Sequence, residues 1–356
     1  MQEIIHLFYH ILINKAMVYP TLTYILTTAF TLCLTYTVYV RHLSAYNGVL
    51  AFFLISTLSV FSISYFYRPV QHWIFSLLNI PLIENKNTDR MSFQEAIQRR
   101  PFFIYLYALI SSIYFICLYV NLTSIDSAFL FVLFGVLGRL VQVPLAEFYL
   151  KERIIKRNLY YAGLLISSGG IILYQLYSKP EFMTSYSVWD LITALIYLIG
   201  ASINSILFKY ATVPSLIGND KYIPVKLASV ITLAIEACFG FVLVIILFLT
   251  GVVNLGSLIP SINQIVAILV FGSVVPILFT LSANIVNHID HVVARAADGI
   301  RIGLGAVLAA IIMYMSGDLG VLMMNIEYKI SGILMVLVGT FIAFLGSPLW
   351  DSKNVQ

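Results

Sequence analysis

Long apolar runs constrain the fold of this chain more than any other feature of its sequence. Each run is about 20 residues long, which is the length that an α-helix needs to cross the hydrocarbon core of a bilayer. Helices suit that position because they satisfy their own backbone hydrogen bonds where water is absent. We therefore predict an all-α integral membrane protein with ten transmembrane helices. The predicted ranges are 20–40, 46–66, 101–120, 126–150, 158–177, 188–209, 226–251, 263–285, 290–315 and 328–346.

The composition excludes an ordinary soluble domain. Hydrophobic residues make up 60% of the chain and charged residues 10%, whereas about a quarter of an ordinary soluble domain is charged. Cys33, Cys117 and Cys238 lie within apolar runs and share no CxxC spacing, so the sequence indicates neither a disulfide framework nor a zinc site. The sequence also contains no Walker pattern, catalytic-triad pattern or metal-ligand cluster. We expect no enzymatic activity, no cofactor and no nucleic-acid partner.

Lysine and arginine are distributed unevenly between the two sides of the predicted bundle. Positively charged loops are retained on the cytoplasmic side of a membrane. Only Arg41, Lys179 and Lys329 fall on the side opposite to the N-terminus. The N-terminal side holds Lys15, Arg68, Lys86, Arg90, Arg99, Arg100, Lys151, Arg153, Lys156, Arg157, Lys209, Lys221, Lys226 and Lys353. Both termini are therefore predicted to be cytoplasmic, in a membrane that the sequence does not identify.

The ten predicted helices divide into two sets of five, at residues 20–177 and 188–346, which residues 178–187 join. Because each set has an odd number of helices, the second set lies inverted relative to the first. Inverted five-helix repeats are typical of secondary transporters, whose substrate site lies near the midplane where the repeats meet. Two short matches between the sets support the repeat. They are Ile125-Asp126-Ser127-Ala128 with Ile289-Asp290-His291-Val292, and the glycine pair Gly163 and Gly170 with Gly332 and Gly339.

Three segments are not predicted to cross the membrane. Residues 1–19 are expected to lie along the interface, and residues 347–356 form a cytoplasmic tail. Residues 68–100 form a cytoplasmic loop that ends with the capping-box pattern Ser92-Phe93-Gln94-Glu95. That pattern predicts a short amphipathic helix ending at Arg99-Arg100. We interpret this helix as a topological anchor, with a regulatory role as the alternative.

Polar side chains inside the fourth and ninth predicted helices indicate a functional interior. Arg295, Asp298 and Arg301 follow one another at three-residue spacing, so Asp298 can pair with either arginine. Arg139 lies at mid-membrane depth in the fourth helix, and Gln142 follows it on the same face. Charged groups at that depth are costly and usually face a polar cavity. Guanidinium groups donate planar pairs of hydrogen bonds to phosphate and carboxylate groups. We therefore predict that the three arginines bind substrate, together with Gln142 and Asp298. The alternative is a salt-bridged interior that only fixes helix packing.

Four more residues are candidates for counter-charge or coupling. Glu147 and Glu236 could each offset an arginine, and Glu236 lies well inside the seventh predicted helix. Asp290 opens the ninth helix, where an acidic side chain caps free backbone N–H groups. Capping is the preferred interpretation of Asp290, and substrate contact is the alternative. His291, three residues after His288, is interpreted as plain polar surface. The alternatives are a proton or gating residue at the cytoplasmic mouth and, less favoured, a metal ligand.

Several motifs resemble those of a known family. The stretch from Leu118 to Pro144, then Leu150-Lys151-Glu152-Arg153-Ile154 and Gly163-Leu164-Leu165-Ile166, is similar to helices three to five of the drug/metabolite transporter superfamily. The resemblance implies ten helices in two inverted repeats. Nucleotide-sugar transporters of that superfamily carry phosphate-contacting basic residues midway along helix four and early in helix nine. Arg139 and Arg295 fall close to those places, with Asp290 as the preceding acid, although the family usually has lysine.

These observations favour a secondary transporter that moves a small polar anion by alternating access. The expected solute is phosphate-bearing or nucleotide-linked, and exchange is expected because an empty site with buried charge reorients slowly. One alternative is a proton-coupled or facilitative exporter of amino acids or similar zwitterions, with Asp298 or Glu236 binding the ammonium group or a proton. A second is a non-transporting membrane scaffold. The expected partners are a small-molecule substrate and the lipid bilayer, and a homodimer stays open as the assembly.

Overall fold

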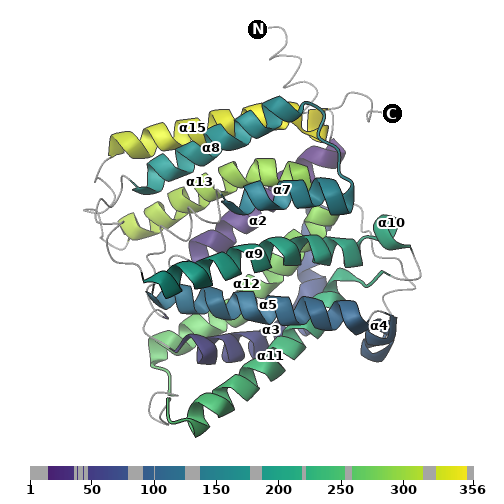
Figure 1. Cartoon of the computed structure of the whole chain (residues 1–356), viewed down its shortest axis with the longest axis vertical. Coiled ribbons are helices and arrows are strands. Elements are labelled where there is room, and N and C mark those ends of the chain that lie inside the picture. The colour runs from purple at the N-terminus through teal and green to yellow at the C-terminus, as the bar shows by residue number, and fades with distance from the viewer. Residues whose placement is uncertain are drawn as a thin grey trace.

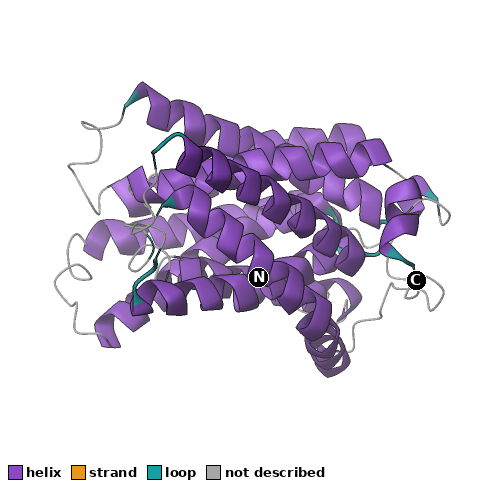
Figure 2. Ribbon diagram, turned by 90° about the horizontal axis from the view of Figure 1, so that it is seen from below, coloured by secondary structure: helices purple, strands orange, loops and turns teal. Residues whose placement is uncertain are grey.

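The protein is an all-helical bundle. The computed structural model describes residues 15–35, 38, 43, 47–78, 91–99, 101–124, 137–176, 187–218, 222–252, 259–315 and 326–350, and these ranges contain no strand. Their long helices lie side by side (Figures 1 and 2). The predicted interfacial segment up to residue 14, Asp126, residues 178–186 and the tail from residue 351 lie outside the described part.

A helix occupies each of the ten predicted positions, at least in its described portion. These helices are α2 (Lys15–Leu34), α3 (Gly48–Leu78), α5 (Pro101–Ser124), α7 (Arg139–Leu145, continued as a π-helix over Ala146–Leu150), α8 (Arg157–Leu176), α9 (Val188–Thr212), α11 (Val225–Leu249), α12 (Ile262–His288), α13 (His291–Met315) and α15 (Ile326–Gly346). Two short helices, α4 (Phe93–Arg99) and α10 (Pro214–Ile217), lie at one end of the bundle, which we name the α4–α10 end (Figure 1).

The length and apolarity of the helices identify a multi-pass membrane protein. Among the described helices, α3, α9, α11, α12 and α15 are long and apolar enough to cross a bilayer. A sixth candidate combines α4 with α5, which meet at a bend of 100°. Many large apolar side chains lie exposed on these helices, as expected where lipid rather than water surrounds the bundle; examples are Trp189, Leu249 and Ile262. The prediction of an α-helical membrane protein is confirmed at this level.

The helix α3 is longer than its predicted range of 46–66. It runs on through Arg68 and Pro69 to Leu78, so the first part of the predicted cytoplasmic loop is helical. The extension is held by tertiary contacts, because Phe75 is buried and packs edge-on against His288 at 5.7 Å between ring centroids. The short helix expected at the end of the loop is present as α4. The Glu95 N–H donates to the Ser92 hydroxyl over 3.1 Å at its start.

The helices α8 and α15 pack antiparallel through glycines. A Cβ added to Gly163 would lie 2.5 Å from the carbonyl oxygen of Gly339, and one added to Gly170 would lie 2.6 Å from that of Gly332. Such distances leave no room for a side chain, so the two backbones are in direct contact. The pairing of the first glycine of one helix with the second of the other requires opposite chain directions. The glycine pairs noted in the sequence therefore meet across a single interface, as small residues do in membrane bundles.

Candidate functional site

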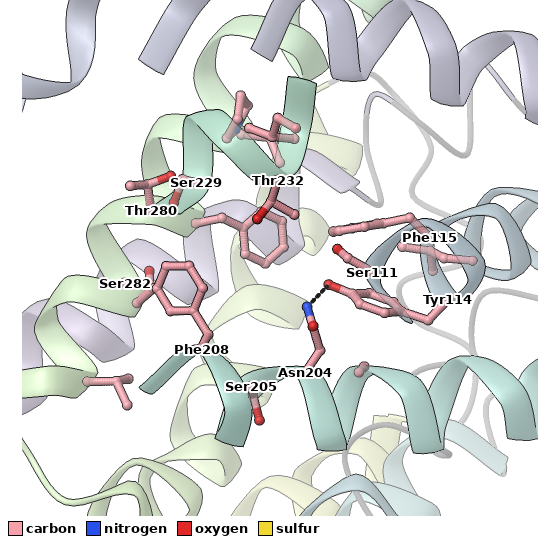
Figure 3. A pocket seen from close by; sticks show the side chains of 18 of the residues that line it. Ser111, Tyr114, Phe115, Asn204, Ser205, Phe208, Ser229, Thr232, Thr280 and Ser282 are labelled. Atoms are coloured by element: carbon pink, nitrogen blue, oxygen red, sulfur yellow. Dashed lines mark hydrogen bonds between the residues drawn. The ribbon is translucent and has the colours of Figure 1, made fainter. Parts of the chain in front are cut away.

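A cavity of about 360 Å³, lined by apolar as well as polar and charged side chains, lies inside the bundle. Its described lining comes from α2, α3, α5, α7, α9, α11, α12 and α13, so most of the molecule contributes to it. Figure 3 shows Ser111 and Tyr114 of α5 facing Asn204 of α9 across part of this space, and the Asn204 amide donates to the Tyr114 hydroxyl over 3.4 Å. Hydroxyl and amide groups thus lie among apolar side chains in the interior of the bundle, where a polar group without a hydrogen-bond partner costs free energy.

A cluster of charged residues on α13 meets one wall of the cavity. The Asp298 carboxylate forms ion pairs with Arg295 (Nη1 to Oδ2, 2.9 Å) and with Arg301 (Nε to Oδ1, 2.7 Å). The three-residue spacing places all three side chains on one helical face, as predicted from the sequence. Asp298 is 1% exposed, whereas Arg295 and Arg301 both line the cavity. The carboxylate therefore lies behind the two guanidinium groups.

Tyr24 of α2 completes this cluster. Its hydroxyl donates to Asp298 Oδ1 over 3.0 Å and accepts from Arg295 Nη2 over 2.8 Å. Tyr24 is buried and also lines the cavity. Sequence reasoning missed this residue, because a tyrosine in an apolar run carries no signal until its partner helix is known. We refer to Tyr24, Arg295, Asp298 and Arg301 as the arginine cluster.

Arg139 lies next to the arginine cluster but does not line the described cavity. Its side chain is 1% exposed and donates from Nη1 to the Ser167 hydroxyl of α8 over 3.0 Å. It lies within coulombic reach of Asp298, Arg295 and Arg301. Gln142, one turn later on α7, does line the cavity, and its amide nitrogen lies 3.5 Å from the Ser202 hydroxyl of α9. The helices α7 and α13 therefore bring their arginines close to one another, but Arg139 does not reach the described cavity lining.

Glu236 of α11 lines the cavity at a different wall. The side chain is 1% exposed and accepts a hydrogen bond from the Ser111 hydroxyl of α5. Within the described part of the chain it forms no ion pair with an arginine, and Arg295 and Arg301 pair with Asp298 instead. Glu147 is also separate from them. It accepts from Arg157 over 2.9 Å and from the Tyr161 hydroxyl over 3.0 Å, away from the described cavity lining.

A second ionic network lies at the junction of α12 and α13. Lys209 Nζ pairs with Glu152 Oε1 at 2.8 Å and donates to the Ile289 carbonyl over 2.8 Å. Glu152 Oε2 accepts from the Val292 N–H over 2.8 Å, so a residue 140 positions away caps the first turn of α13. Asp290 lies within coulombic reach of both Glu152 and Lys209, and it is not among the residues that line the cavity. Asp290 thus belongs to this network rather than to the cavity wall.

His291, the first residue of α13, joins this network to the cavity. It is 2% exposed, lines the cavity, and its Nε2 lies 3.4 Å from the Ser205 hydroxyl of α9. The interpretation of His291 as plain polar surface is therefore wrong. The sequence placed it at a helix end, but the packing of α9 against that end buries it. Lys209 lines the cavity from the same side.

Comparison with known proteins establishes the fold alone. Eleven chains of solved structures match. One of them, described only as the crystal structure of a protein, aligns with 92% of this chain and 98% of its own, at 15% identity and a TM-score of 0.58. No family model matches the sequence, and no curated protein matches it. The chain therefore shares its helical architecture with solved proteins, while its chemistry has to be argued from its own residues.

Proposed function

We propose that this protein is a secondary transporter that moves a small polar solute bearing an anionic group across the membrane by alternating access. The observation that carries the proposal is the position of two charged side chains, Arg295 and Arg301, on the wall of a cavity inside a bundle of apolar helices. A scaffold has no need for such a cavity, because buried polar groups in a bilayer cost free energy that apolar packing would avoid.

The charges of the arginine cluster favour an anionic ligand. Two guanidinium groups share the single carboxylate of Asp298, so the cluster carries one excess positive charge. Arg139 adds a further positive charge within coulombic reach. Guanidinium groups bind phosphate and carboxylate with planar pairs of N–H donors. Asp298 acts as a counter-ion that keeps the arginines compensated while the cavity is empty, and a bound anion competes with it for their donors.

We also propose that the ten helices form two inverted five-helix repeats. We match α2, α3, α5, α7 and α8 in order with α9, α11, α12, α13 and α15. Several helix contacts then exchange in pairs. The contact of α2 with α13 corresponds to that of α9 with α7, and the contact of α5 with α9 corresponds to that of α12 with α2. The contact of α3 with α12 likewise corresponds to that of α11 with α5. The antiparallel α8–α15 interface pairs each helix with its own counterpart. This correspondence supports a pseudo-two-fold axis through the cavity.

Exchange in proteoliposomes tests the transport proposal. Purified protein is reconstituted, the vesicles are loaded with unlabelled solute, and uptake of the same labelled solute is measured for inorganic phosphate, nucleoside monophosphates, sugar phosphates and carboxylates. We expect at least one phosphate-bearing solute to enter faster in loaded than in empty vesicles. Arg301→Gln is expected to lower this uptake by about tenfold or more, since loss of one partner from a desolvated charge pair costs about 2–5 kcal/mol.

The matched control is Arg157→Gln, because Arg157 forms its ion pair with Glu147 outside the cavity and is largely exposed. This variant is expected to transport like the wild type. If no anionic solute exchanges through folded, reconstituted protein, the proposed function is wrong and the scaffold interpretation gains support.

A further inference from the structure

The cavity has an acidic and aromatic wall that the arginine cluster does not explain. Glu236 of α11 lies there beside Ser111 of α5. Tyr107 and Tyr114, also on α5, are within coulombic reach of the Glu236 carboxyl group. All four residues line the cavity. A titratable group that is almost fully buried, yet borders the space where a solute would bind, is a candidate for direct recognition.

No cation in the described part of the protein pairs with Glu236. The other charged side chains of the cavity wall already have partners, since Lys209 pairs with Glu152, and Arg295 and Arg301 pair with Asp298. The single described hydrogen bond to the Glu236 carboxyl group comes from a neutral hydroxyl. An ionised carboxylate in such a place needs a positive partner, because desolvation is otherwise uncompensated. The cavity supplies the space for one.

Aromatic rings surround the same part of the cavity. Tyr114 packs against Phe115 with 4.4 Å between ring centroids and against Tyr197 of α9 at 5.6 Å. Figure 3 shows Tyr114 and Phe115 together on α5, next to Ser111. Aromatic faces attract ammonium groups through their quadrupole, and they do so more strongly when the pair is removed from water. A carboxylate with several aromatic rings is thus a suitable environment for an amine.

We propose that Glu236, with the rings of Tyr107 and Tyr114, forms a cation subsite for an ammonium group of the transported solute. The inference rests on the proposed function and deepens it: the solute carries an amine at one end and an anionic group at the other. The anionic group binds at Arg295 and Arg301. The two subsites lie on different helices, and Glu236, Arg295 and Arg301 line the same cavity. A solute that binds at both subsites therefore has to span the space between them.

Binding of three matched compounds to the purified full-length protein tests this inference. O-phosphoethanolamine carries both charges, ethyl phosphate lacks the amine, and ethylammonium lacks the phosphate. We expect the wild type to bind O-phosphoethanolamine at least about tenfold more tightly than ethyl phosphate, which corresponds to about 1.4 kcal/mol. Glu236→Gln is expected to bring the two affinities within about twofold of each other and to leave ethyl phosphate binding unchanged.

Two further variants separate recognition from folding. Tyr114→Leu keeps the carboxylate and removes one ring, so it is expected to reduce the preference for the amine without affecting ethyl phosphate. Glu147→Gln removes a carboxylate outside the described cavity lining and is expected to behave like the wild type. Equal binding of O-phosphoethanolamine and ethyl phosphate by the wild type would overturn the cation subsite. An equal loss of both ligands in Glu236→Gln and in Tyr114→Leu would also overturn it, because that pattern indicates a structural role.

The outcomes for the cation subsite and for the proposed function are distinguishable. Ethylammonium binding that Glu236→Gln abolishes, together with no binding of ethyl phosphate, supports the cation subsite and contradicts the anion site. Binding of ethyl phosphate that is indifferent to the amine supports the anion site alone. If none of the three compounds binds, the cation subsite is wrong, whereas the proposed function is decided separately by the exchange assay with the wider set of anionic solutes.

Discussion

Glu152 and Lys209 form an ion pair at 2.8 Å although each side chain is less than a tenth exposed. Glu152 follows α7 and its π-helical continuation, whereas Lys209 lies near the end of α9, so the pair joins the two halves of the chain. The same two side chains bind the backbone of the α12–α13 junction, at Ile289 and Val292. The pair therefore fixes the start of the helix that carries the arginine cluster.

We predict that Lys209→Met lowers the free energy of unfolding by about 3–5 kcal/mol, because it leaves the Glu152 carboxylate buried and uncompensated. The double variant with Glu152→Gln is expected to recover part of that loss. Thermal unfolding in detergent measures both. Arg157→Gln, which breaks an ion pair at an exposed position, serves as the control and is expected to unfold like the wild type.

Because Arg295 and Arg301 share the carboxylate of Asp298, substitutions within the arginine cluster are predicted to lower stability by unequal amounts. Asp298→Asn leaves Arg295 and Arg301 both without their partner, so we expect a loss of about 3–5 kcal/mol in stability. Arg301→Leu leaves the pair of Asp298 with Arg295 intact, so it is expected to destabilise the protein less while abolishing transport of the anionic solute. Thermal unfolding and vesicle exchange, measured on the same preparations, check the order. The reverse order of stability would contradict the shared-carboxylate arrangement.

Removal of the Tyr24 hydroxyl is predicted to lower the stability of the protein without changing its charge. Tyr24→Phe removes a group that donates to Asp298 and accepts from Arg295, and both of these partners are largely buried. We expect a loss of about 1–3 kcal/mol, the usual cost of leaving buried polar atoms unsatisfied. Thermal unfolding measures it, and unchanged stability would show that water or another group takes over the role of the hydroxyl.

The glycine interface between α8 and α15 predicts a steric effect. A Cβ on Gly163 would lie 2.2 Å from the backbone nitrogen of Ala343, so Gly163→Ala forces the two helices apart. We expect a loss of about 1–3 kcal/mol, typical of overpacking. The matched control is Gly303→Ala on α13, where a Cβ would meet nothing within 4 Å. An equal effect of the two substitutions would show that the contact between α8 and α15 is looser than described.

The topology prediction rests on the distribution of basic residues. With both termini cytoplasmic, a single cysteine introduced as Met183→Cys is expected to react with an impermeant thiol reagent added outside right-side-out vesicles. Asn87→Cys is expected to be protected there. The comparison uses a background from which Cys33, Cys117 and Cys238 have been removed. The opposite labelling pattern would reverse the predicted orientation.

The sequence alone determined the positions of the helices, because the length and apolarity of a membrane helix are local properties. It also placed Arg295, Asp298 and Arg301 on one face of one helix, since their spacing fixes their relative direction. The limit of this reasoning is visible at α3, which continues past Arg68 and Pro69 to Leu78. Its extension depends on the contact of Phe75 with His288, two residues that lie far apart in the chain.

The tertiary structure decided which polar residues share a cavity. Tyr24 and Asp298 are separated by 274 positions, and Glu152 caps a helix that begins 139 residues later, at His291. Spacing along the chain cannot predict such partners, because they depend on which helices pack together and at what rotation. The sequence therefore identified charges that need compensation. The packing of α2, α9, α11 and α13 determined which groups compensate them and which, such as Glu236, line the cavity.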